Sequence, residues 1–156
     1  MLGAGEGHDH NLISMMPSLT SLIARETGPK AMAKAGIRHD DIDLTMIYDS
    51  FTYTVMLTLE SLGFCARGEA ADFVANQRTA PGGDFPLNTA GGGLSYTHPG
   101  MYGSFLLVEA VRQLRGEAGA RQVHKKGTTD QNPQISLVNG TGGSLSSTGT
   151  VVLGTG

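Results

Sequence analysis

The stretch that decides the fold is DDIDLTMIYDSFTYTVMLTLESLG, residues 40–63, in which a short apolar run passes directly into a helical pattern. The first part is typical of a turn that leads into a strand, with Leu44, Met46 and Ile47 facing the interior. Over residues 51–63 the apolar side chains recur at helical spacing, and the closing glycine predicts the end of a helix. A strand joined tightly to a helix in this way indicates a layered α/β domain.

The segment before this unit is expected to hold one helix. Thr27 followed by Pro29 predicts its start, because a hydroxyl caps the first turn and proline needs no partner for a backbone N–H there. Gly36 predicts its end. Residues 1–26 open on a glycine-rich run, which predicts a loop or extension.

The segment after this unit is expected to hold a short helix, a loop rich in proline and glycine, and a second helix from Pro99 to Arg115. Two strands then close the chain, PQISLVNG (133–140) and GTVVLGT (149–155), with a loop between them. The order helix, strand, helix, loop, helix, strand, strand again indicates a layered α/β domain.

Composition excludes several classes of protein. The chain has 156 residues, of which 39% are hydrophobic and 16% charged, which suits one folded domain with a core. A net charge of −3 argues against binding of nucleic acid. A single cysteine, Cys65, excludes an internal disulfide framework. The apolar runs are too short to span a membrane, and the opening lacks the pattern of a signal peptide, so a cytoplasmic protein is expected.

His8, Asp9 and His10 stand close together in the opening run, and histidines beside a carboxylate are potential metal ligands. No second pair of ligands follows at the spacing of a zinc site. We therefore expect no metal.

The stretch GGGLSYTHPGMYGS, residues 91–104, has the composition of an active-site loop. Its glycines let the backbone turn sharply or approach a ligand closely. His98 precedes Pro99, so its backbone is extended and its side chain lies at the entrance of the following helix. A neutral imidazole there can donate a hydrogen bond to an oxyanion. The alternative is a structural histidine that bonds to loop carbonyls.

Two further segments are candidates for the same rim. Tyr48, Ser50 and Tyr53 lie where a strand passes into a helix, a place where ligands commonly bind in α/β sheets. The alternative is that Ser50 caps the helix and the tyrosines pack in the core. Residues 139–143, NGTGG, predict a tight loop between the closing strands, although Asn-Gly is also an ordinary hairpin turn.

Three longer segments, YDSFTYTVMLTLESLGFCARGEAADFV (48–74), TAPGGDFPLNTAGGGLSYTHPGMYGS (79–104) and VEAVRQLRGEAG (108–119), resemble the C-terminal half of thiolase-fold proteins, in the branch of sterol-carrier and lipid-transfer thiolases. The resemblance implies one domain over residues 1–156, with a layered α-β-α arrangement and a mixed sheet flanked by helices. It also implies a missing N-terminal half, against which residues 1–26 would pack.

The departures from that branch concern its cysteines. Thiolases of the branch carry His-Asp-Cys-Phe where this chain has Tyr48-Asp49-Ser50-Phe51, whereas their His-Pro is present as His98-Pro99. The loop that carries an acid/base cysteine in classical thiolases begins here with Asn139. The family's nucleophilic cysteine would lie in the missing half, and Cys65 lies outside these motifs, so we expect it to be structural. Serine does not replace a thiol as nucleophile or acid without further activation.

The pattern therefore resembles thiolase-like aldolases of steroid side-chain degradation, which cleave a β-hydroxyacyl-CoA by retro-aldol chemistry. The resemblance implies that His98 stabilises a thioester enolate and that Tyr102 or Tyr53 takes the proton of the β-hydroxyl. A free tyrosine has a pKa of about 10, so it needs a partner that stabilises its phenolate. The catalytic candidates are His98, Tyr102, Tyr53, Tyr48, Ser50 and Asn139, and the substrate-binding candidates are Gly91, Gly92, Gly93, Gly140, Gly142 and Gly143.

The resemblance also implies partners. The substrate is an acyl-CoA that carries its own coenzyme A, with no tightly bound cofactor, and the assembly is a homo- or hetero-oligomer with a thiolase-like N-terminal half or second chain and an OB-fold accessory protein. Two other functions stay open. One is an acyltransferase whose cysteines come from another chain. The other is a non-catalytic module that binds lipid or acyl-CoA.

Overall fold

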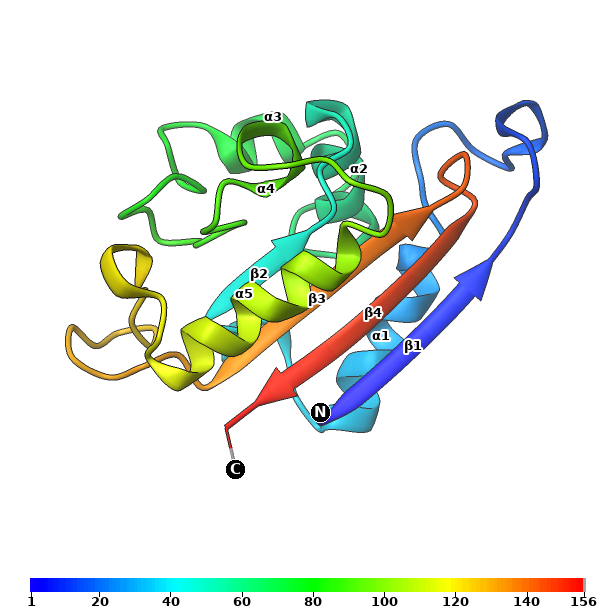
Figure 1. Cartoon of the computed structure of the whole chain (residues 1–156). Coiled ribbons are helices and arrows are strands. Elements are labelled where there is room, and N and C mark those ends of the chain that lie inside the picture. Colours follow the sequence, from blue (N-terminus) through cyan, green and yellow to red (C-terminus); the bar gives the residue numbers. More distant parts are fainter. Residues whose placement is uncertain (156) are drawn as a thin grey trace.

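A four-stranded sheet lies between helices on both of its faces in the computed structural model, which describes residues 1–155 (Figure 1). In spatial order its strands are β1 (Gly3–His8), β4 (Ser147–Gly154), β3 (Ile135–Gly142) and β2 (Leu44–Ile47). The pairings of β1 with β4 and of β4 with β3 are antiparallel, whereas β3 and β2 are parallel. The predicted mixed sheet is confirmed.

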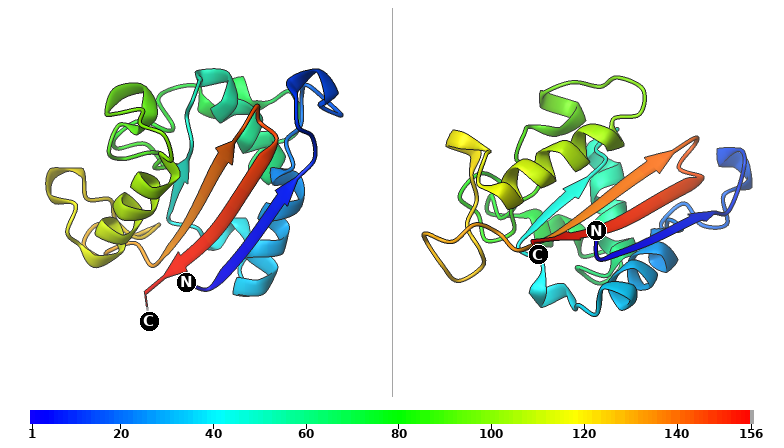
Figure 2. Two further views of the ribbon diagram at one scale, coloured as in Figure 1. Left: turned by 45° about the vertical axis from the view of Figure 1, so that its right-hand side comes forward. Right: turned by 60° about the horizontal axis from the view of Figure 1, so that its bottom comes forward.

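The helices form the outer layers. Helices α1 (Ala24–Ala35) and α2 (Thr52–Leu62) pack against one face, and α5 (Gly103–Arg115) lies across the other face over β2 and β3 (Figure 2). Two short helices, α3 (Ala70–Val74) and α4 (Gly92–Ser95), belong to the long connection between α2 and α5. Three single 3-10 turns are η1 (Ile13–Met15), η2 (His39–Asp41) and η3 (Gly119–Arg121).

The two faces of the sheet carry separate apolar cores. On β3, Leu137 packs in the core under α1 and α2, whereas its neighbour Val138 packs in the core under α5. On β2, Ile47 joins the first core and Met46 joins the second. This alternation is the period of two of a strand that is buried on both faces. It also explains why all four residues of 44–47 are buried and why all but one of them, a threonine, are apolar.

The prediction of a loop at the start of the chain is wrong for residues 3–8, which form the edge strand β1. Its glycines face α1 at a distance that leaves no room for side chains. A Cβ atom on Gly3 would lie 2.1 Å from the Ala31 carbonyl oxygen, and one on Gly5 would lie 2.5 Å from the Thr27 carbonyl oxygen. The glycines therefore allow a close approach of helix and strand. That the rest of residues 1–26 packs on another half stays a prediction.

Two helix starts also differ from the prediction. Helix α1 begins at Ala24, three residues before Thr27, because the buried side chains of Leu22 and Ile23 extend the packed segment. Thr27 is not a cap: its hydroxyl lies in the core, 2.8 Å from the Thr150 hydroxyl. Helix α5 begins at Gly103 and not at Pro99, because Met101 adopts the left-handed conformation with φ +62° and interrupts a helix there.

The helix ends were predicted more accurately. Gly36 and Gly63 follow α1 and α2 in the left-handed conformation that glycine adopts without steric cost. The loop predicted over residues 139–143 lies later in the chain, since residues 139–142 belong to β3 and residues 143–146 connect it to β4. Within residues 1–155, no helix combines the length and the apolar character needed to cross a bilayer.

The close packing of β1 on α1 predicts the effect of one methyl group. Replacing Gly5 by alanine forces the Cβ atom against backbone of α1, and we expect a loss of unfolding free energy of about 1–3 kcal/mol. The matched control is Gly149→Ala, on the adjoining strand β4, where a Cβ atom meets nothing within 4 Å. Urea unfolding of both variants measures the difference. Equal stability of the two variants would contradict the packing argument.

Candidate active site

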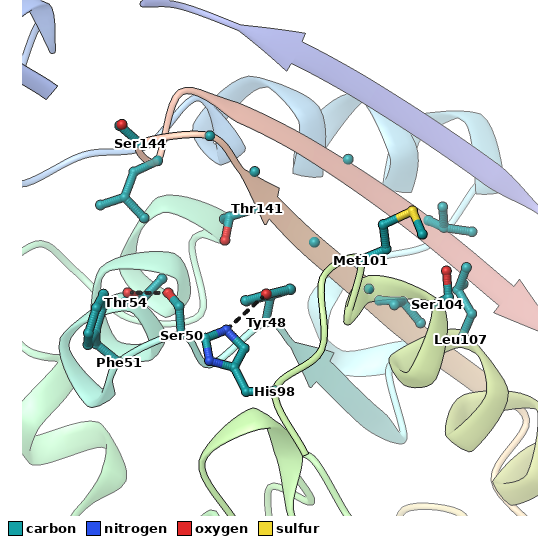
Figure 3. Close-up of a pocket in the computed structure, with 18 of the residues that line it drawn as sticks. Tyr48, Ser50, Phe51, Thr54, His98, Met101, Ser104, Leu107, Thr141 and Ser144 are labelled. Atoms are coloured by element: carbon teal, nitrogen blue, oxygen red, sulfur yellow. Dashed lines mark hydrogen bonds between the residues drawn. The ribbon is translucent and has the colours of Figure 1, made fainter. Parts of the chain in front are cut away.

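A cavity with a volume of about 1100 Å³ opens between α2, the start of α5 and the hairpin of β3 and β4. Its wall is formed by segments far apart in the sequence, which the sheet brings to one rim (Figure 3). The polar or small residues at this wall include Tyr48, Ser50, Tyr53, Thr54, His98, Ser104, Gly140, Thr141, Gly142, Gly143 and Ser144.

Tyr48 is the first residue after β2, and its position is fixed from both sides. Its backbone N–H donates to the Asn139 carbonyl at 2.9 Å, so the pairing with β3 continues past the end of the strand. On the other side, the Asn88 side chain accepts from the Ile47 N–H at 2.8 Å and donates to the Ile47 carbonyl at 2.7 Å. The Tyr48 ring is held edge-on by Tyr102, with the ring centroids 5.5 Å apart.

The hydroxyl of Tyr48 lies 3.1 Å from Nε2 of His98, and this pair forms the polar centre of the cavity wall (Figure 3). The two residues are 50 positions apart in the sequence. His98 is exposed and lies in the loop before α5, as the adjoining proline predicted. A phenol and an imidazole at hydrogen-bond distance can pass a proton between them.

Asp49 anchors the segment that leads to His98. Asp49 is 5% exposed, and its carboxylate accepts hydrogen bonds from the backbone N–H groups of Gly93, at 2.6 Å, and Leu94, at 3.2 Å. A Cβ atom on Gly92 would lie 2.1 Å from this carboxylate, so the glycine is needed for the contact. The support function of Asp49 was not predicted, because the short helix α4 that it holds has no apolar period to mark it.

Ser50 and Tyr53 also line the cavity, but their hydroxyls are engaged. The Ser50 hydroxyl lies 3.1 Å from that of Thr54, and no side chain caps α2. The Tyr53 hydroxyl donates to the Leu19 carbonyl at 2.6 Å. Tyr53 is thus tied to the loop after β1.

The predicted binding glycines divide into two groups. Gly140, Gly142 and Gly143 lie at the cavity, where their lack of side chains leaves room for a ligand. The three glycines of residues 91–93 do not line it. Asn139 lies in β3, fully buried and turned away, and its amide donates to the Thr150 hydroxyl at 2.8 Å.

Tyr102 does not line this cavity either. It lies just before α5, is 1% exposed, and stacks on Phe105 with centroids 5.7 Å apart. Burial, and then the negative charges of Asp49 and Glu109, raise the pKa of Tyr102 to about 12. The environment of Tyr102 therefore disfavours a phenolate, which makes the residue a poor base.

Sequence reasoning missed the apolar part of the wall, to which Ile13, Phe51, Met101, Leu107 and Leu145 contribute. These side chains come from loops, from the 3-10 turn η1 and from α5, and no regular period links them. An apolar residue such as Leu145 within a run of glycine and serine was the available signal.

No group of three or more His, Cys, Asp or Glu side chains within residues 1–155 is arranged to hold a metal ion. Cys65 packs against the core under α1 and α2, away from the cavity. Burial, and then Glu60 and Glu69, raise the pKa of its thiol, which disfavours the nucleophilic thiolate.

The raised pKa of Tyr102 predicts a late titration. Since folding favours the neutral phenol, its contribution to stability is complete below pH 10 and is lost as the pH rises towards about 12. We expect a phenolate absorbance step near pH 12 that Tyr102→Phe removes and that the control Tyr96→Phe, at an exposed tyrosine, leaves in place. A step that persists in Tyr102→Phe would contradict the assignment.

Two curated relatives each match a little over half of the chain. It is 47% identical over 91 residues to the "Steroid side-chain-cleaving aldolase" of Thermomonospora curvata, and 44% identical over 91 residues to the "17-hydroxy-3-oxo-4-pregnene-20-carboxyl-CoA lyase" of Mycobacterium tuberculosis. Each match covers 57% of this chain and 22% of the relative. The matched segment is thus about a fifth of the length of these relatives.

A solved structure extends the likeness to almost the whole chain. The structure described as "Ltp2-ChsH2(DUF35) aldolase" superimposes with a TM-score of 0.79 at 33% sequence identity, and the match covers 97% of this chain and 38% of that one. The family described as "Thiolase C-terminal domain-like" matches residues 5–155. The chain belongs to this thiolase C-terminal domain-like family.

Proposed function

We propose that this chain supplies the C-terminal half of a thiolase-like aldolase, which cleaves a β-hydroxyacyl-CoA by a retro-aldol reaction. The observation that carries the proposal is the pair formed by Tyr48 and His98 at the wall of a cavity that no cysteine lines. The names of the two curated relatives, an aldolase and a CoA lyase, support the same class of reaction.

The first step removes the proton of the substrate's β-hydroxyl. In the proposed mechanism the Tyr48 oxygen accepts this proton while its own proton passes to Nε2 of His98, 3.1 Å away. The imidazole thereby removes the difficulty of using a tyrosine as a base at neutral pH, because a full phenolate never has to form. His98 thus acts as a proton acceptor, a different role from the oxyanion donor that the sequence suggested.

The second step breaks the bond between the α and β carbons. The electron pair moves to the thioester carbonyl, which gives an enolate and releases a ketone or aldehyde. Gly140, Gly142 and Gly143 allow the thioester to approach the backbone of the wall. The proton held on His98 then returns through Tyr48 to the α carbon, which yields the shortened acyl-CoA and restores both side chains.

The apolar wall suits an apolar acyl group. The cavity that holds the polar pair is also lined by Ile13, Met101, Leu107 and Leu145. Burial of an apolar chain there contributes about 25 cal/mol per Å² of surface removed from water. A steroid or lipid side chain has this character. Coenzyme A is carried by the substrate in this proposal and is not a resident cofactor.

The assembly that we propose includes a thiolase-like N-terminal half. The outer side of α5 and the loop before it expose Met101, Phe105 and Val108, and Leu94 and Tyr96 are exposed nearby. Such apolar surface is typical of a face that another domain covers. The name of the solved relative joins two proteins, which supports a partner chain, and an OB-fold accessory protein remains part of the proposal. The native mass of the protein from its source, with each co-purifying chain identified, tests the assembly.

Replacement of Tyr48 by phenylalanine tests the mechanism in that assembly. We expect kcat for cleavage of a β-hydroxyacyl-CoA to fall by about 10²–10⁴-fold, with KM changed little, because proton transfer is lost and binding is not. Tyr102→Phe should cause a much smaller loss, and Tyr96→Phe is the control. Full activity of Tyr48→Phe would overturn the proposal.

The same assay separates the other functions. Transfer of an acyl group from a 3-ketoacyl-CoA to coenzyme A, without cleavage of the hydroxy substrate, would identify an acyltransferase. Binding of both thioesters without turnover, unaffected by His98→Ala, would identify a non-catalytic module.

A further inference from the structure

The hairpin between β3 and β4 forms one wall of the cavity and has a strained backbone. Gly143, Ser144 and Leu145 all line the cavity. Leu145 adopts the left-handed conformation with φ +62°, which is unfavourable for a residue with a branched side chain. At Gly143, with φ +59°, a Cβ atom would lie 2.4 Å from the Ser146 hydroxyl. A wall of this kind keeps its shape only where surrounding groups hold it.

Residues 8–10, at the end of β1, supply these holding contacts. The Asp9 N–H donates to the Ser146 carbonyl at 3.1 Å. Nδ1 of His8 lies 2.8 Å from the Ser147 hydroxyl, and Nε2 of His10 lies 3.0 Å from the Ser144 carbonyl oxygen. The His10 contact is the one that reaches the tip of the hairpin at the cavity.

Both nitrogen atoms of His10 face acceptors. Nδ1 lies 2.5 Å from a carboxylate oxygen of Asp9, and Nε2 faces the Ser144 carbonyl. A neutral imidazole has only one N–H, so it can donate only one of these two bonds. The His10 side chain is 1% exposed, so water cannot replace the missing donor. Both bonds can form when one additional proton lies between His10 and Asp9. Imidazole is a stronger base than a carboxylate, so this proton resides on the ring, which is then an imidazolium.

The charges around this pair are few. Asp9 is the acidic neighbour, and its second carboxylate oxygen, which makes no hydrogen bond, lies 3.7 Å from a guanidinium nitrogen of Arg25 on α1. His8 adjoins Asp9 on the strand side and contacts Ser147 and Asn11. The hairpin residues 143–146 carry no titratable side chain. Asp9 is therefore the acidic group that contacts the His10 ring, and Arg25 is the basic group that faces Asp9 from a larger distance.

We propose that His10, as an imidazolium paired with Asp9, is a positioning residue that fixes the hairpin wall of the cavity in the shape that receives the thioester substrate. When the ring loses its second proton, the N–H facing Asp9 is kept because the carboxylate is the stronger acceptor. The Ser144 carbonyl then loses its donor, and the tip of the hairpin loosens. The identity of the ligand rests on the proposed function, whereas the state of the ring and of the hairpin does not.

Nuclear magnetic resonance of the ring nitrogens tests the protonation directly, in the protein with its co-purifying chains. We expect both nitrogens of His10 to carry hydrogen at the pH where the hairpin is rigid. One bare ring nitrogen at that pH would overturn the proposal.

Hydrogen exchange of the hairpin amides tests the consequence. As the pH rises through the loss of the second proton, exchange at residues 143–146, corrected for its intrinsic pH dependence, should become about 10–100-fold faster. Asp9→Asn keeps an oxygen that can accept the hydrogen bond from the His10 ring but removes the negative charge. The pH at which exchange in the hairpin becomes faster should therefore be lower in this variant. His10→Gln removes the titrating group and should abolish this pH dependence. His124→Gln, at an exposed histidine elsewhere, is the control.

Kinetics then show whether the hairpin serves the reaction. With a β-hydroxyacyl-CoA, Asp9→Asn should raise KM as the pH increases while kcat changes little, since the Tyr48–His98 pair is untouched. An unchanged KM in a variant whose hairpin has loosened would overturn the positioning role. If the wild-type protein cleaves no thioester, the proposed function fails, and the resonance and exchange results still decide the state of His10.

Discussion

The hydrogen bond from the Tyr48 N–H to the Asn139 carbonyl is the contact on which the site depends, because it continues the parallel pairing of β2 and β3 past the last strand residue. Parallel strands end at the same edge of a sheet, and α2 and α5 both begin there. The Tyr48 ring is therefore delivered to the cavity on the α5 side of the sheet. The Asn139 side chain points to the opposite side of the sheet. The pairing of β2 with β3 therefore fixes the directions of both side chains.

On that opposite side, the sheet is joined to α1 by buried polar groups. The Asn139 amide donates to the Thr150 hydroxyl, which lies 2.8 Å from the Thr27 hydroxyl on the helix. All three residues are fully buried, and a lost partner would leave a polar group unsatisfied at a cost of about 1–3 kcal/mol. The network thereby fixes the register of β3, β4 and α1. Since the glycines of β1 already bring α1 close, the backbone that carries the cavity rests on a rigid layer.

The parts of the fold that the sequence revealed were those with apolar side chains in a regular period. Residues 40–63 have such a period, and the strand and helix there were predicted closely. Strand β1 was missed because its core-facing positions are Gly3, Gly5 and Gly7, which present no side chain whose hydrophobicity could alternate. The start of α5 was misplaced because the left-handed conformation of Met101 has no signature in a methionine.

The residues of the candidate site were predictable from the sequence only in part. Tyr48, Ser50, Tyr53 and His98 were expected at one rim, and all four line the cavity. Their pairing was not predictable, since the contact between Tyr48 and His98 joins positions 50 residues apart. Tyr102 was one of two candidate bases, and a helix beginning at Pro99 would have placed it one turn into that helix. The real helix begins after it, and Tyr102 is left in the core behind Tyr48.

The position of Asp49 decides how the polar pair can work. A carboxylate next to a tyrosine in the sequence could act as its proton acceptor, but the oxygens of Asp49 receive the N–H groups of Gly93 and Leu94. These two bonds occupy both carboxylate oxygens and direct them to the backbone of α4. The same two bonds hold α4, from which the chain leads to His98. In the mechanism that we propose, Asp49 therefore takes no part in proton transfer, and the imidazole of His98 accepts the proton of Tyr48.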